Sequence, residues 1–175
     1  RVVGPVRNAA GTMVSLFELP TAHPYAWVVP VIAKYPDAAV AEAVRAPNFP
    51  YASVALIDTA STTAAVALTA IPAPLAIKTT VSAYAPGRAT ILLDAPAPAG
   101  SALMVSESYY PGWQATVDGQ PAKAERANLA LIGVALPAGA RKIELTFEST
   151  PYHRGKSVTL VAIGLSALLM LGGAM

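Results

Sequence analysis

Cysteine is absent from the 175-residue sequence, and charged residues make up only 13% of it. Without cysteine there can be no disulfide, no thiolate metal site and no cysteine nucleophile. The net charge of +2 is too small to indicate a nucleic-acid-binding surface, so we expect no nucleic-acid partner. Neither a glycine-rich phosphate loop nor a Gly-x-Ser-x-Gly nucleophile elbow occurs, which argues against nucleotide-binding enzymes and serine hydrolases.

Two histidines and three aspartates remain as candidates for chemistry. His23 lies in a turn and His153 lies beside an apolar segment, and two histidines alone do not define a metal site. Asp58, Asp94 and Asp118 each follow a predicted strand beside a turn, where an aspartate caps neighbouring backbone groups. Capping is favoured over the alternative, a carboxylate pair for glycoside chemistry. We therefore predict no enzyme activity in this chain, and no catalytic, cofactor-binding or metal-binding residue.

The stretch 109–119 is the starting point for interpreting the rest of the sequence, because it combines a predicted strand with a turn on each side. Pro111-Gly112 predicts a turn, and Trp113 then begins a strand in which apolar and polar residues alternate. Asp118-Gly119 predicts a two-residue type I′ hairpin, which needs positive φ at both central positions. Three clustered aromatic residues offer a glycan or partner contact, although packing of Trp113 in a sheet is favoured; the three are Tyr109, Tyr110 and Trp113.

Short apolar or alternating segments separated by Pro, Gly and Asp predict an all-β fold, an antiparallel, jelly-roll-like β-sandwich of nine or ten strands. One short helix is predicted over residues 37–45, between Pro36 and Pro47. Pro30 within residues 25–33 indicates a bulge or an edge position. Eleven segments are candidates for these strands: 13–19, 25–33, 54–57, 65–69, 77–83, 89–93, 102–106, 113–117, 122–126, 129–136 and 142–147.

The last 19 residues, 157–175, carry no charge. As a helix they would be about 28 Å long, close to the thickness of a bilayer's hydrocarbon core, so we predict a transmembrane helix. A buried hairpin or core helix is the alternative. Tyr152, Arg154 and Lys156 precede this run, as expected at a membrane interface. The predicted organisation is a lead-in over 1–12, a sandwich over 13–150, an interfacial linker over 151–156 and the membrane helix.

These residues resemble those of a known family. The sequence Tyr-Tyr-Pro-Gly-Trp-Gln-Ala-Thr-Val-Asp-Gly at 109–119, the pair Ala127-Asn128, the segment 134–139, the strand 143–147 and the terminal apolar run are similar to the C-terminal end of YfhO-type bacterial membrane proteins. The likeness extends more loosely from Val14 to Met175. Tyr25 stands where the resemblance leads us to expect arginine.

The resemblance implies a multi-spanning membrane protein of the lipid-linked-sugar glycosyltransferase class, with an extracytoplasmic β-sandwich before a last membrane helix. The catalytic acids of that class are expected in a loop that no residue here matches. We therefore expect a non-catalytic structural or interaction subunit of a larger membrane assembly, with respiratory and photosynthetic complexes as candidate hosts. The alternative is an accessory glycan- or acceptor-binding domain.

The expected location is the bacterial inner membrane, with a single C-terminal span and the bulk of the domain in the periplasm. Membrane lipid and other membrane protein subunits are the expected partners, and a glycan is a further candidate ligand. Both ends of the sequence suggest a part of a longer polypeptide.

Overall fold

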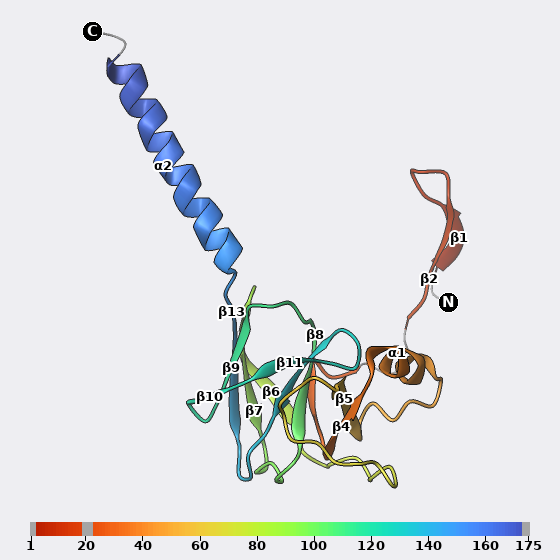
Figure 1. The fold of residues 1–175 in the computed structure, drawn as a ribbon. Helices are drawn as coiled ribbons and strands as arrows, with labels where there is room; N and C mark the ends of the chain where they lie inside the picture. The colour runs from red at the N-terminus through yellow and green to blue at the C-terminus, as the bar shows by residue number, and fades with distance from the viewer. Residues whose placement is uncertain (1–2, 19–22, 173–175) are drawn as a thin grey trace.

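The computed structural model describes residues 3–18 and 23–172, and its body is a β-sandwich with one short helix packed on it (Figure 1). Within the described residues the strands form a five-stranded sheet, a six-stranded sheet and a separate two-stranded hairpin. The strands are β1 (Val3–Arg7), β2 (Met13–Leu16), β3 (Ala26–Val29), β4 (Val31–Tyr35), β5 (Val54–Asp58), β6 (Thr79–Ala85), β7 (Arg88–Leu93), β8 (Ala102–Ser108), β9 (Trp113–Val117), β10 (Gln120–Ala122), β11 (Ala124–Ala127), β12 (Leu131–Ala135) and β13 (Lys142–Phe147).

The five-stranded sheet is antiparallel, in the order β10-β9-β13-β7-β6. Alternation places Ile143 and Leu145 of β13 and Ile91 of β7 on one face, where all three are fully buried. These side chains meet residues of β8 and β12 from the second sheet, and together they form the main core. The predicted sandwich is therefore confirmed as a mostly β fold of packed sheets.

The six-stranded sheet, in the order β3-β8-β12-β11-β5-β4, curls back on itself. Its two edge strands, β3 and β4, are consecutive in the chain and are separated only by Pro30, so its edges come together at that residue. The concave face encloses a second core, in which three of the seven buried residues are the small Ala55, Ala102 and Ala127. Gly133 belongs to the same set, because a Cβ there would lie 2.8 Å from the Ala127 Cβ. Small residues thus permit the tight curvature.

Helix α1 (Asp37–Arg45) covers the outer face of β4 and β5. Val40 is buried there against Ala33, Val54 and Leu56, which alternate with the inward-facing residues of the same strands. The chain runs β4–α1–β5, and the two strands are parallel, which requires such a crossover. The exclusively antiparallel sandwich that we expected is therefore wrong at this pair, although the helix has the bounds that were predicted.

Several predicted strands are shifted or divided, and the divisions have physical causes. The segment 122–126 is split at Lys123, where the chain leaves β9 of one sheet for β12 of the other. The segment 25–33 is split at Pro30, as described above. The segment 65–69 is not a strand; Val66 N donates one bond to Ile32 O (2.9 Å), and Leu68 packs against α1.

The two ends of the chain depart from the predicted boundaries. The lead-in is part of a hairpin, since β1 pairs with β2, and β2 lies in this hairpin and not in either sheet of the sandwich. Leu19, the predicted end of that strand, lies outside the described residues. Helix α2 (Thr150–Gly172) begins before the apolar run and includes the predicted interfacial linker. It leaves the sandwich after β13 and extends away from it (Figure 1).

No helix among the described residues is both long enough and apolar enough to cross a membrane. The transmembrane helix predicted from residues 157–175 is therefore not supported by the structure, and residues 173–175 of that run lie outside the described part of the chain.

Candidate binding groove

An open groove of about 600 Å³ lies between α1 and the six-stranded sheet. One wall comes from β3 and the residues before it, a second from the segment after α1, and a third from the turn between β11 and β12. Pro47 follows Ala46, whose extended backbone (φ −65°, ψ 132°) ends α1, as expected for a residue before proline. The lining residues are His23, Trp27, Val44, Ala46, Pro47, Phe49, Tyr51, Ser106, Asn128, Leu129, Ala130 and Leu131.

Aromatic rings form the centre of this groove. Tyr51 lies edge to face with His23 (centroids 4.9 Å apart, 86°) and with Trp27 (6.1 Å, 82°). The Trp27 indole Nε1 donates a hydrogen bond to the Tyr51 carbonyl oxygen (2.9 Å), which fixes the orientation of the indole. The rings are therefore held in place before any ligand arrives.

The β11–β12 turn supplies the strained part of the wall. Asn128 (φ 45°) and Leu129 (φ 78°) both adopt the left-handed region, which is rare for a leucine. Asn128 is buried, and its Oδ1 accepts a bond from Leu56 N (2.8 Å) while its own N–H donates to Leu56 O (2.8 Å). Arg126 donates to the Leu129 carbonyl oxygen (3.3 Å) and pairs with Asp37 at the start of α1. Strain held so firmly beside a groove is typical of functional sites.

The chemistry of the lining restricts what the groove can do. Among the described residues, no aspartate, glutamate, lysine or arginine lines it, and the titratable side chains in its lining are His23 and Tyr51. A neutral, aromatic-lined groove of this size suits an uncharged ligand held by stacking and a few hydrogen bonds. Within the described residues there is also no group of three or more acidic, histidine or cysteine side chains that could hold a metal ion.

The residues predicted as a glycan or partner contact lie apart from this groove. Trp113 is half-buried against the main core, its ring centroid is 5.4 Å from that of Phe147, and its Nε1 donates to Ser108 O (3.2 Å). Tyr109 is also half-buried, whereas Tyr110 is 63% exposed. Two further tyrosines have other partners: Tyr51 contacts His23 and Trp27, and Tyr84 contacts Tyr25.

A polar cluster of Tyr25, Tyr84 and Glu107 joins the two sheets of the sandwich. The phenols of Tyr25 and Tyr84 both donate to Glu107 Oε1 (3.1 Å each), and their rings meet edge to face at 5.7 Å. Burial and the neighbouring Glu107 carboxylate raise the pKa of Tyr25 well above its ordinary value. Both phenols therefore act as hydrogen-bond donors to Glu107 of β8, and the bond from Tyr84 connects β6 with β8.

The three aspartates accept backbone hydrogen bonds at the ends of strands. Asp58 Oδ1 accepts from Ala60 N (2.6 Å), Asp94 Oδ1 accepts from Lys78 N (2.8 Å), and Asp118 accepts from Lys142 N (2.8 Å). The predicted capping of neighbouring backbone is thus confirmed for Asp58, whereas Asp94 and Asp118 accept from backbone groups that are distant in sequence. His23 packs on Tyr51, and the side chain of His153 lies outside the described part of the chain.

The comparison with family models found a match in the C-terminal part of the chain. Residues 75–159 match the model of the family described as bacterial membrane protein YfhO. Over these residues the chain is similar to the YfhO family. The match includes β6–β13, the strained β11–β12 turn and the first turns of α2, whereas α1 and Trp27 of β3 lie outside it. The looser likeness of residues 14–74 and 160–175 to YfhO proteins stays a prediction. No curated protein and no solved structure matches the chain.

Proposed function

We propose that this chain is a non-catalytic β-sandwich module that α2 holds in a membrane, where it contacts other subunits of a larger assembly. The observation that carries the proposal is the exposure of α2. Apolar side chains around this helix are between 58% and 73% exposed, which water would not favour. They are Val158, Leu160, Val161, Ile163, Leu165 and Met170.

The sequence and the family support the same proposal. The uncharged run 157–175 continues past the end of α2 at Gly172. Tyr152, Arg154 and Lys156 are exposed on the first turns of α2, an arrangement typical of a membrane interface. YfhO proteins are bacterial membrane proteins. We further propose that the span crosses the inner membrane and that the sandwich lies on the periplasmic side.

Two measurements on bacterial membranes test this proposal. Membranes containing the chain are washed with alkaline carbonate, and the chain should remain in the pellet because α2 is embedded in lipid. Purification in mild detergent, followed by mass spectrometry, should recover a particle with other membrane proteins in fixed stoichiometry. Release by carbonate would contradict the membrane anchor, and a monodisperse single chain would contradict the role as a subunit.

The absence of cysteine allows a direct test of sidedness. Ala138 is exposed in a turn of the sandwich, so Ala138→Cys places the only thiol of the protein there. A maleimide that cannot cross membranes should label this variant in intact spheroplasts if the sandwich is periplasmic. Labelling that requires lysis would place the sandwich in the cytoplasm.

The groove favours a second candidate function, an accessory domain that binds a glycan or acceptor. Its neutral lining and fixed aromatic rings suit uncharged sugars, which stack on such faces. Titration with neutral oligosaccharides should shift the fluorescence of Trp27, and Tyr51→Ala should abolish the shift. Trp113→Phe is the control, because that indole lies outside the groove lining. An unchanged spectrum of the parent protein across the series would exclude this function.

A further inference from the structure

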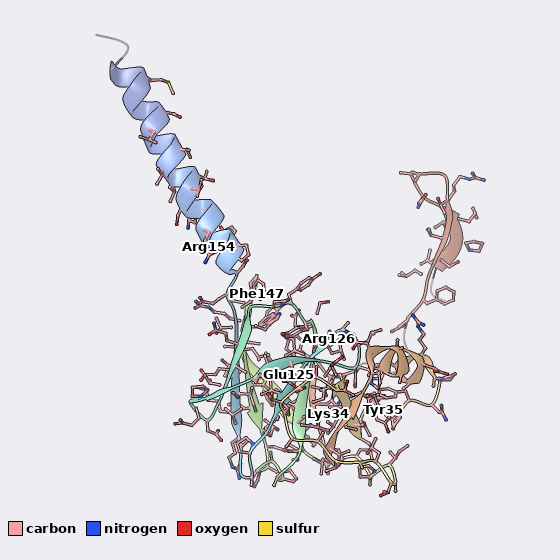
Figure 2. All side chains as sticks on the ribbon, viewed as in Figure 1. Lys34, Tyr35, Glu125, Arg126, Phe147 and Arg154 are labelled. Carbon is pink, nitrogen blue, oxygen red and sulfur yellow. The ribbon has the colours of Figure 1, made fainter. Side chains whose placement is uncertain are left out.

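The two ends of the sandwich differ in composition. We define the α2 end as the end where β13 finishes and α2 begins. Phe147 N donates there to Gly87 O (2.7 Å), and Glu148 N donates to Gly112 O (2.9 Å). These bonds bring the β6–β7 turn and the connection between β8 and β9 beside the base of α2. Figure 2 places Phe147 at this junction and Arg154 on the helix just beyond it.

Exposed aromatic side chains gather at the α2 end. Tyr84 and Tyr110 are 61% and 63% exposed, Phe147 is 37% exposed at the end of β13, and Tyr152 is exposed on the first turn of α2. The charged residues there are mixed in sign. Arg88, Arg154 and Lys156 are exposed cations, and Glu148 is an exposed acid, while Glu107 accepts hydrogen bonds from two tyrosines.

The opposite end provides an internal comparison. Its turns comprise residues 94–101, 118–119 and 136–141, which lie together because Leu93 N donates to Arg141 O (2.8 Å) and Asp118 N donates to Lys142 O (2.8 Å). None of these turn residues is aromatic. Both ends are made of tight turns between strands of the same sheets, so turn geometry alone does not explain why aromatic residues gather at one of them.

We propose that the α2 end of the sandwich rests on the surface of a lipid bilayer, with Tyr84 and Tyr110 at the level of the headgroups. This inference depends on the proposed function, because α2 must first anchor the chain. Tyrosine is amphipathic and favours the membrane–water interface, where its ring meets the acyl region and its hydroxyl meets water. Since cations and acids are mixed at this end, the contact depends on aromatic residues more than on charge.

Because the protein contains no cysteine, a single introduced cysteine can be labelled specifically at each of two positions. Ala85 at the α2 end and Ala138 at the opposite end are both exposed alanines, so Ala85→Cys and Ala138→Cys form a matched pair. Each full-length variant carries a polarity-sensitive fluorophore and is reconstituted into phosphatidylcholine vesicles. The Ala85 label should shift to the blue and be quenched severalfold more than the Ala138 label by lipids that carry a nitroxide near the headgroup. Equal quenching at the two positions would overturn the inference.

Flotation of the same vesicles separates the two proposals. If the chain does not float with the lipid, the membrane anchor itself is wrong. If it floats while both fluorophores emit as they do in water, the proposed membrane anchor is retained and the proposed surface contact is wrong. Added anionic lipid or salt should change the Ala85 signal little, and a strict requirement for anionic lipid would show that the cations, and not the aromatic residues, carry the contact.

Removal of the aromatic residues provides the second test. The double variant Tyr84→Ser/Tyr110→Ser should lose most of the blue shift at the Ala85 label. Tyr35→Ser is the control, because Tyr35 is also exposed but lies beneath α1, away from the α2 junction (Figure 2). Near-ultraviolet circular dichroism checks that all variants keep their packing. A double variant that is folded and keeps the full blue shift would contradict the role given to these tyrosines.

Discussion

Asn128 holds the turn between β11 and β12 in a backbone conformation that few residues accept (φ 45°). Asn128→Ala removes the acceptor of the buried Leu56 N–H and places an alanine in the left-handed region. We expect a loss of about 3 kcal/mol in the free energy of unfolding. Asn128→Asp keeps the acceptor and should lose about 1 kcal/mol or less. Equal losses in urea unfolding of the two variants would show that the side-chain bond contributes little.

Glu125 makes the stability depend on pH. Burial raises the pKa of this carboxyl, but the ion pair with Lys123 and the Ser61 hydroxyl outweigh burial, so its pKa lies below the ordinary value. A carboxyl whose pKa is lower in the folded protein stabilises the fold above its unfolded pKa, and this stabilisation is lost as the pH falls through the folded pKa.

The corresponding variant is Glu125→Gln, which keeps the size of the side chain. We expect it to lose about 1–3 kcal/mol at neutral pH, and to lose less additional stability than the parent when the pH falls below about 4.5. Glu144→Gln is the control, because its ion pair with Lys142 is on the surface and contributes about 0.5 kcal/mol at most. Parallel curves of unfolding free energy against pH for the parent and Glu125→Gln would contradict this assignment.

At the scale of elements, Gly112 fixes the junction between the sandwich and α2. It has a φ of 125°, and a Cβ at this position would lie 2.5 Å from the Glu148 carbonyl oxygen, which is backbone and cannot swing away. Gly112→Ala should therefore cost about 3 kcal/mol or more in thermal unfolding. Gly119→Ala, with φ 78° and nothing within 4 Å, should cost about 1 kcal/mol. Similar costs for the two variants would mean that the junction tolerates displacement.

The elements that sequence patterns predicted well are those whose cause is local. The bounds of α1, β9 and β13 agree with the prediction, since flanking prolines, alternation and the Asp118-Gly119 hairpin act within a few residues. The curl of the six-stranded sheet was not predictable in this way, because it depends on Gly133 meeting Ala127 across two strands. The crossing between sheets at Lys123 was missed because the alternation of polarity continues through it.

The groove was missed for a related reason. Its aromatic centre joins Trp27 to Tyr51, and its strained wall comes from Asn128 and Leu129, roughly a hundred residues further along the chain. Taken alone, each of these residues predicts only core packing or a turn. Two signals were available in the sequence: a second tryptophan in a strand, and the Ala127-Asn128 pair in the family likeness. Neither could show that the two regions share a surface, because that depends on the pairing of β11 with β5.

At the scale of the whole molecule, the stability of the sandwich does not depend on where α2 is placed. The three cores are built from the sheets, α1 and the segments that join them, and among the residues that the structure describes none of the core residues belongs to α2. Figure 1 shows the helix extending beyond the body after β13. The sandwich should therefore fold without α2, and the need for detergent should belong to the helix alone.

A chain that spans residues 23–149 tests this separation. It should remain in aqueous solution without detergent and unfold cooperatively, because every core residue is retained. The midpoint of its thermal unfolding should lie within a few degrees of the midpoint measured for the full chain in micelles. The full chain should sediment with lipid or aggregate when detergent is removed, since the exposed apolar residues of α2 then face water. If the shorter chain unfolds at room temperature or aggregates, then α2 stabilises the sandwich directly. The membrane anchor would then contribute to the stability of the fold as well as to the location of the protein.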